Sequence, residues 1–118
     1  MKTILIIDDD EILRETLADI FMEFKYYVVE ANNDIDGLEK VKINCPDLII
    51  CDLDMQRLTG YCFILELQKS NFSKIPVLFL CSDYELKVKG VLGSAKNFLT
   101  KPFKVHDLKK TINYCLNF

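Results

Sequence analysis

The sequence has no long apolar run, which excludes a helix that spans a membrane. Its longest apolar stretches, such as Ile4–Ile7 and Val77–Cys81, are far shorter than the roughly 20 residues that such a helix needs. The amino terminus also lacks the features of a signal peptide, because its apolar part is short and three aspartates follow it directly. We therefore expect neither export nor membrane insertion, and a cytoplasmic location.

An excess of positive charge is missing as well. Lys and Arg number 15 against 18 Asp and Glu, so the net charge is −3. This balance argues against nucleic acid or an anionic membrane surface as a direct partner. The 118 residues suffice for one domain, so we expect a single domain over 1–118 with no output domain.

The five cysteines include no Cys-x-x-Cys pair, and their number is odd. A secreted disulfide framework usually has an even number, and a zinc site needs closely spaced pairs. We expect reduced thiols that pack as small apolar residues. The set comprises Cys45, Cys51, Cys62, Cys81 and Cys115.

Short apolar runs alternate along the chain with stretches whose apolar residues recur at three- and four-residue steps. This alternation predicts parallel strands joined by helices, and hence a doubly wound α/β domain whose sheet is covered on both faces. The predicted strands are Thr3–Ile7, Tyr27–Glu30, Leu48–Cys51, Val77–Cys81 and Phe98–Thr100. The predicted helices have apolar faces at Leu13–Phe24, Ile35–Val41, Gly60–Gln68, Ser82–Leu92 and Val105–Leu116, the second capped by Asn33 or Asp34.

Charged side chains follow three of the predicted strands. Asp8 to Asp10 follow the first, Asp52 and Asp54 the third, and Lys101 the fifth. Ligands bind at the carboxyl ends of the strands in such sheets. Each group alone has a structural explanation, since an aspartate can cap a helix and a lysine can simply be solvated. Together they predict a cation site of oxygen ligands.

Magnesium suits such a site. It keeps several waters and takes one or two carboxylates together with phosphate oxygens. Converging carboxylates repel one another by several kcal/mol, roughly, unless a cation offsets the repulsion. A carboxylate beside Mg²⁺ and an ammonium group can attack phosphorus and form an aspartyl phosphate.

At these residues the sequence resembles the receiver domains of two-component response regulators. The similarity runs from Ile4-Leu5-Ile6-Ile7-Asp8-Asp9 to Lys101-Pro102-Phe103, nearly the whole chain. It implies a stand-alone, chemotaxis-receiver-like domain with the flavodoxin-like (βα)5 fold, a three-layer sandwich with strand order 2-1-3-4-5.

The resemblance also implies a role for each residue of the site. Asp52 matches the phosphoacceptor, and Asp9 matches a direct Mg²⁺ ligand beside Asp8, which acts largely through water. The backbone carbonyl of Asp54 matches the third protein ligand. Lys101 matches the lysine that contacts the phosphoryl group, and in the family its bond to the following proline is cis.

The implied function is that of a phosphorylated signalling protein. A sensor histidine kinase or phosphotransfer protein would donate the phosphoryl group to Asp52 with Mg²⁺. An effector protein would read the result through the face of the fourth helix, fifth strand and fifth helix. The chain would catalyse only its own phosphorylation and dephosphorylation and would have no separate substrate.

Two positions that contact or sense the phosphoryl group depart from the family pattern. Cys81 stands where the family has Ser or Thr, and a thiol is a weak hydrogen-bond donor. Ser82 either replaces that hydroxyl or only caps a helix. Phe98 stands at the switch aromatic that is often Tyr, and it cannot form a hydrogen bond. Phosphorylation chemistry therefore looks intact, while signal transmission looks altered.

Several alternatives remain open. The domain could be a degenerate receiver that binds its partner without phosphorylation. Cys51-Asp52-Leu53-Asp54 also resembles the Asp-x-Asp motif of haloacid-dehalogenase-like phosphatases, although that family places it after the first strand. Asp54 and Asp83 either tune the lifetime of the aspartyl phosphate or are solvated acids. His106, the only histidine, is expected at the surface.

Overall fold

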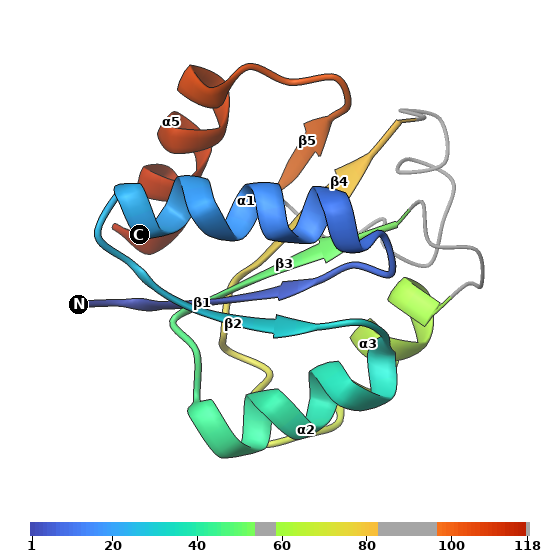
Figure 1. Ribbon diagram of the computed structural model, residues 1–118. Helices are drawn as coiled ribbons and strands as arrows, with labels where there is room; N and C mark the ends of the chain where they lie inside the picture. Colours follow the sequence, from blue (N-terminus) through green and yellow to red (C-terminus); the bar gives the residue numbers. More distant parts are fainter. Residues whose placement is uncertain (54–58, 83–96, 118) are drawn as a thin grey trace.

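The computed structural model describes residues 1–53, 59–82 and 97–117, with only the backbone described at 59–62 (Figure 1). Five parallel strands form one sheet in the order β2-β1-β3-β4-β5, which confirms the order that the resemblance implied. The strands are β1 Thr3–Ile7, β2 Tyr27–Ala31, β3 Leu48–Asp52, β4 Val77–Cys81 and β5 Phe98–Thr100. The described helices, labelled as in Figure 1, are α1 Glu11–Glu23, α2 Asp34–Asn44, α3 Thr59–Gln68 and α5 Val105–Leu116.

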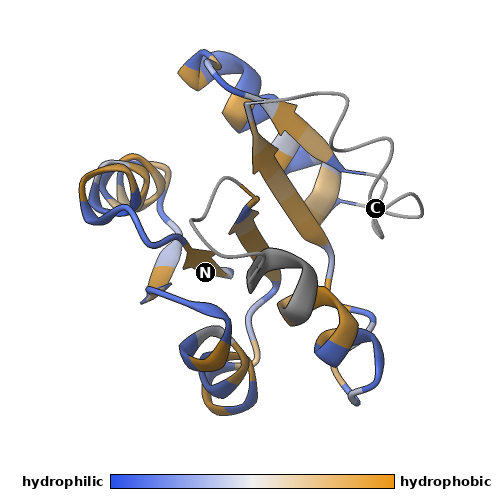
Figure 2. Cartoon of the chain, turned by 90° about the vertical axis from the view of Figure 1, so that its right-hand side faces the viewer, coloured by the Kyte–Doolittle hydropathy of each residue, from blue (hydrophilic) through white to orange (hydrophobic). Residues whose placement is uncertain are grey.

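The helices cover both faces of the sheet. Helices α1 and α5 lie on one face and α2 and α3 on the other, which makes the predicted three-layer sandwich (Figure 1). Viewed toward the carboxyl ends of the strands, the mostly hydrophobic strands lie in the middle, and the helices around them carry both hydrophilic and hydrophobic residues (Figure 2). This arrangement follows from the sequence pattern, since continuous apolar runs fit strands that are buried on both sides.

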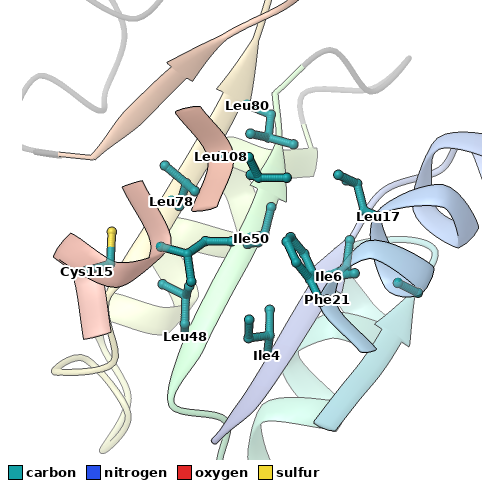
Figure 3. Close-up of a cluster of buried hydrophobic side chains, with 12 residues drawn as sticks. Ile4, Ile6, Leu17, Phe21, Leu48, Ile50, Leu78, Leu80, Leu108 and Cys115 are labelled. Carbon is teal, nitrogen blue, oxygen red and sulfur yellow. The ribbon is translucent and has the colours of Figure 1, made fainter. Parts of the chain in front are cut away.

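Alternate residues of each central strand enter two separate apolar clusters. Ile4 and Ile6 of β1 pack with Ile50 of β3 and with α1 and α5, as Figure 3 shows. Leu5 and Ile7 point to the opposite face and pack with α2 and α3. Because successive side chains of a strand point to opposite faces, both halves of each run are buried. Each such side chain contributes about 1.5–3 kcal/mol on burial.

Side-chain caps begin the first two helices. Asp10 Oδ1 accepts hydrogen bonds from the amides of Ile12 (3.0 Å) and Leu13 (3.2 Å) at the start of α1. Asn33 Oδ1 accepts one from the amide of Asp36 (2.8 Å) at the start of α2. Asn33 is thus the cap of the two candidates, and the third aspartate after β1 serves α1.

A glycine lets α2 lie close to the sheet. A Cβ atom at Gly37 would stand 2.6 Å from Ile7 Cδ1 and 3.3 Å from Phe63 Cε1. Both neighbours are fully buried, so there is little room for them to move. A glycine inside a helix destabilises it by about 1 kcal/mol relative to alanine, and the close packing of α2 against the sheet offsets this loss at Gly37.

The structure corrects three expectations from apolar patterning. The apolar pattern predicts Ile35 and Val105 on the core faces of α2 and α5, but Ile35 is 74% exposed and Val105 is 49% exposed. Both stand in the first turn of their helices, at the rim of the core. Cys45 is also exposed, because it ends α2 in a left-handed conformation (φ 43°) instead of packing inside. The helix predicted over Ser82–Leu92 lies, after Ser82, outside the described residues.

Candidate functional site

Two charged residues from distant parts of the chain meet at the carboxyl edge of the sheet. Asp52 is the last residue of β3, and Lys101 follows β5. Lys101 Nζ lies 2.9 Å from Asp52 Oδ2, and only 3% of Asp52 is exposed. The amide of Lys101 donates a hydrogen bond to the carbonyl of Cys81 at 3.0 Å, which ties this residue to the end of β4. A buried carboxylate is thus held beside an ammonium group.

Asp8 lies at the same edge, directly after β1, and is 1% exposed. Its amide donates to the carbonyl of Ala31 (3.1 Å), and its Oδ1 accepts from the amide of Asp10 (2.9 Å). Its carbonyl accepts from Arg14 Nη1 at 2.8 Å. Among the described residues, Asp8 Oδ2 is the one buried side-chain oxygen or nitrogen without a hydrogen-bond partner.

The surroundings of Asp8 disfavour its charged form. Burial is the largest influence, and with the negative charge of Asp52 it raises the pKa of Asp8 from 3.8 to about 7. The amide of Asp10 and the positive charge of Lys101 act in the opposite direction. The charge on Asp8 therefore depends on the charges of Asp52 and Lys101.

These features fit a divalent cation with oxygen ligands. The partnerless Oδ2 of Asp8 and the repulsion from Asp52 both favour a further positive charge in addition to that of Lys101. No three acidic, His or Cys side chains of the described ranges stand close enough to bind a metal by themselves. A metal with one or two carboxylates and several waters suits this arrangement, and Mg²⁺ has that preference.

The other predicted metal ligands are placed in part. Asp9 lies between β1 and α1 and is exposed toward solvent. Asp54 lies outside the described residues, as does Asp83, so the structure does not test the roles expected of them. The bond between Lys101 and Pro102 is cis, as the resemblance implied.

The predicted switch residues lie on β4 and β5. Cys81 is the last residue of β4 and is fully buried, whereas the neighbouring Ser82 is exposed. Phe98 begins β5, is partly buried, and its ring centroid lies 5.6 Å from that of Phe79. Their positions agree with the expected ones, while their roles stay predictions. His106 in α5 is exposed, as expected.

Arg14 is a residue of the site's surroundings that patterning missed. It belongs to α1, and its guanidinium contacts both the Asp8 carbonyl and the Glu30 carboxylate of β2. The sequence gives only a weak indication of this role. Arg14 stands four residues after the helix cap Asp10, and this spacing places its side chain next to the first turn of α1. Only the folded chain brings Glu30 within reach.

Comparison with known proteins identifies one family over most of the chain. A family model described as the response regulator receiver domain matches residues 4–113. The chain is 29% identical over 116 residues to the chemotaxis protein CheY of Bacillus subtilis, covering 97% of each chain. It is also 29% identical over 108 residues to hybrid signal transduction histidine kinase D of Dictyostelium discoideum, which covers 89% of this chain but 7% of that protein.

A solved structure gives the same result. The response regulator TrrA of Thermotoga maritima, in complex with Mg(2+)-BeF, superposes with a TM-score of 0.88 at 26% identity, over 98% of this chain and 100% of that one. In the part of the chain that the structure describes, no helix is long and apolar enough to span a membrane.

Proposed function

The chain belongs to the family of response regulator receiver domains, and on that basis we propose that it is a phosphoacceptor that takes a phosphoryl group on Asp52. The single observation that carries the proposal is the buried Asp52 carboxylate with Lys101 Nζ at 2.9 Å, beside the buried Asp8. Receiver domains of two-component systems are signalling proteins.

The donor is a sensor histidine kinase or a phosphotransfer protein that carries phosphohistidine. A carboxylate oxygen of Asp52 attacks phosphorus, the N–P bond breaks, and the imidazole leaves with the bonding pair and takes up a proton. The product is a mixed anhydride on Asp52. Hydrolysis reverses the modification: water attacks phosphorus, the anhydride bond breaks, and inorganic phosphate leaves.

Lys101 and the acidic residues stabilise the charge of this transfer. The ammonium group of Lys101, already held at Asp52, follows the developing charge onto the phosphoryl oxygens. Asp9, Asp52 and the carbonyl of Asp54 would hold Mg²⁺, with Asp8 acting largely through water. When bound, Mg²⁺ neutralises negative charge between the carboxylates and the incoming phosphoryl group.

The effector protein binds the face formed by the helix predicted over Ser82–Leu92, β5 and α5. Cys81 stands next to the acceptor strand with a thiol in place of a hydroxyl, so its contact with a phosphoryl oxygen is weak. The hydroxyl of Ser82 supplies the stronger donor in this proposal. Phe98 responds to modification by packing alone, since its ring has no polar group.

Intact mass after incubation with acetyl phosphate and Mg²⁺ tests the proposal. We expect one phosphoryl group on the wild-type protein, and none on Asp52→Asn or in the presence of a chelator. The adduct should disappear at the rate of anhydride hydrolysis when acetyl phosphate is removed. If wild type takes up neither a phosphoryl group nor the analogue beryllofluoride, the proposal is wrong and the domain binds its partner unmodified.

A further inference from the structure

Arg14 links the loop that carries Asp8 and Asp9 to the neighbouring strand. Its Nη1 donates to the carbonyl of Asp8 at 2.8 Å, and its Nε donates to Oε1 of Glu30 at 3.0 Å. The side chain of Arg14 is 15% exposed and that of Glu30 is 39% exposed, so the guanidinium is largely shielded from water while the carboxylate beside it is partly open to solvent. The arginine therefore connects α1, the end of β1 and the end of β2 at one point.

The contact with Arg14 completes the fixation of Asp8. The amide, the carbonyl and Oδ1 of this residue each have a hydrogen-bond partner, at 3.1, 2.8 and 2.9 Å. With these three groups held, the direction of Oδ2 is set by the backbone, and Oδ2 is left without a partner among the described residues. Asp9 is the next residue, so the same carbonyl contact also limits rotation of the peptide that joins it to Asp8.

Glu30 orients the arginine in turn. Its carboxylate holds Nε of Arg14, while its own carbonyl accepts a hydrogen bond from Lys40 Nζ at 3.3 Å. A planar guanidinium can serve two acceptors at once in a fixed geometry, whereas a single ammonium group presents no such fork. The Arg14–Glu30 pair thus acts as a brace between the acidic loop and β2.

We propose that Arg14, oriented by Glu30, is a positioning residue that holds the Asp8–Asp9 segment in the geometry that binds the divalent cation. The inference rests on the proposed function, in which that cation is Mg²⁺. Arg14 does not touch the metal or the phosphoryl group. It acts through the backbone of Asp8, and its effect is on the affinity for Mg²⁺.

The sign of the effect separates this role from simple electrostatics. Arg14 is a cation close to a cation site, so removing its charge strengthens Mg²⁺ binding if charge is all that matters. Loss of positioning weakens binding instead. Residues that hold metal ligands in place commonly change metal affinity by about 10- to 100-fold. Because Arg14 acts on a carbonyl and not on the ligating carboxylate, we expect the lower end, about tenfold.

Calorimetric titration of the metal-free protein with Mg²⁺ tests the inference. Arg14→Met keeps the apolar stem and removes both contacts, and we expect it to bind about tenfold more weakly. Arg14→Lys keeps the charge and loses the fork, so it should also bind more weakly than wild type. Glu30→Gln loses the charge that orients Arg14 and should show a smaller decrease. Lys40→Met removes a cation that contacts the carbonyl of Glu30 and the carboxylate of Asp36 but leaves both Arg14 contacts in place, so it is the matched control and should not lose affinity.

Each outcome decides between the explanations. Unchanged or tighter Mg²⁺ binding by Arg14→Met, with wild type binding normally, overturns the inference and leaves the proposed function intact. A wild-type protein without Mg²⁺ binding overturns the proposed function and the inference with it. If Arg14→Met does not fold, as judged by circular dichroism, Glu30→Gln and Arg14→Lys decide instead, and wild-type affinity in both refutes the positioning role.

Discussion

Replacing Asp8 by Asn should stabilise the metal-free protein. The substitution keeps an oxygen that can accept from the Asp10 amide, and it puts an NH2 group in place of the partnerless Oδ2 beside the negative Asp52. The pKa of Asp8 rises from 3.8 to about 7 on folding, about three units, and each unit is worth about 1.4 kcal/mol. The charged carboxylate therefore costs up to about 4 kcal/mol at neutral pH.

The measured gain should be smaller than this limit, because the amide is polar and also loses water on burial. We expect about 2 kcal/mol at pH 8 in a chelator, measured by urea denaturation followed by circular dichroism. Saturating Mg²⁺ should reverse the order, because wild type gains the binding free energy of the metal and the variant loses part of it.

The pH dependence gives the sharper test. Between pH 4 and 7 the folded protein keeps a proton on Asp8 that the unfolded chain has released, so this residue makes wild-type stability fall as pH rises. The stability difference between Asp8→Asn and wild type should be near zero below pH 4, grow up to about pH 7, and stay constant above it. A difference independent of pH, or a variant less stable than wild type at pH 8 without metal, would refute the reasoning.

Three further predictions concern packing, the switch position and the thiols. Gly37→Ala should lower the free energy of unfolding by about 1–2 kcal/mol in urea denaturation, because the added Cβ would stand 2.6 Å from Ile7 Cδ1. Adding Ile7→Val, which removes that Cδ1 atom, should restore part of the loss. A stabilising Gly37→Ala would show instead that the core adjusts to the added methyl group. In a beryllofluoride titration in the presence of Mg²⁺, Cys81→Thr should bind beryllofluoride about tenfold more tightly than wild type, because a hydroxyl is a better hydrogen-bond donor than a thiol. Equal affinity would mean that Ser82 already makes this contact. A thiol reagent should label Cys45 in the native protein at neutral pH and leave Cys51 unlabelled. Cys45 is exposed, whereas burial and the charges of neighbouring carboxylates raise the pKa of Cys51. Peptide mass spectrometry measures the labelling of both sites, and rapid labelling of Cys51 would contradict its burial.

Much of the fold followed from short-range patterns. The apolar runs at Ile4–Ile7 and Leu48–Cys51 predicted strands buried on both faces, and both strands lie in the middle of the sheet. The polar residues directly after the strands then had to lie along one edge, because parallel strands all end on the same side. The order of the strands came from the resemblance to a family and not from the runs.

Exposure at the ends of the helices was predicted less well. Periodicity placed Ile35 and Val105 on the core side of their helices, and both are exposed. A period of 3.6 residues says which side of a helix is apolar, but it does not say where the sheet beneath that side stops. The exposure of Cys45 was missed for a similar reason. The chain turns at Cys45, directly after α2, and this turn directs the Cys45 side chain away from the core.

The order of the residues is enough to predict where the carboxylates and Lys101 stand along the chain, and that they gather at one edge of the sheet. It does not show how deeply Asp8 is buried, that its pKa reaches about 7, or that Arg14 reaches Glu30 and the Asp8 carbonyl at the same time. Secondary structure depends mainly on neighbours a few residues apart, which the sequence displays directly. Desolvation and hydrogen bonds between separate strands depend on residues that are distant in sequence and become neighbours only when the sheet and its helices pack together.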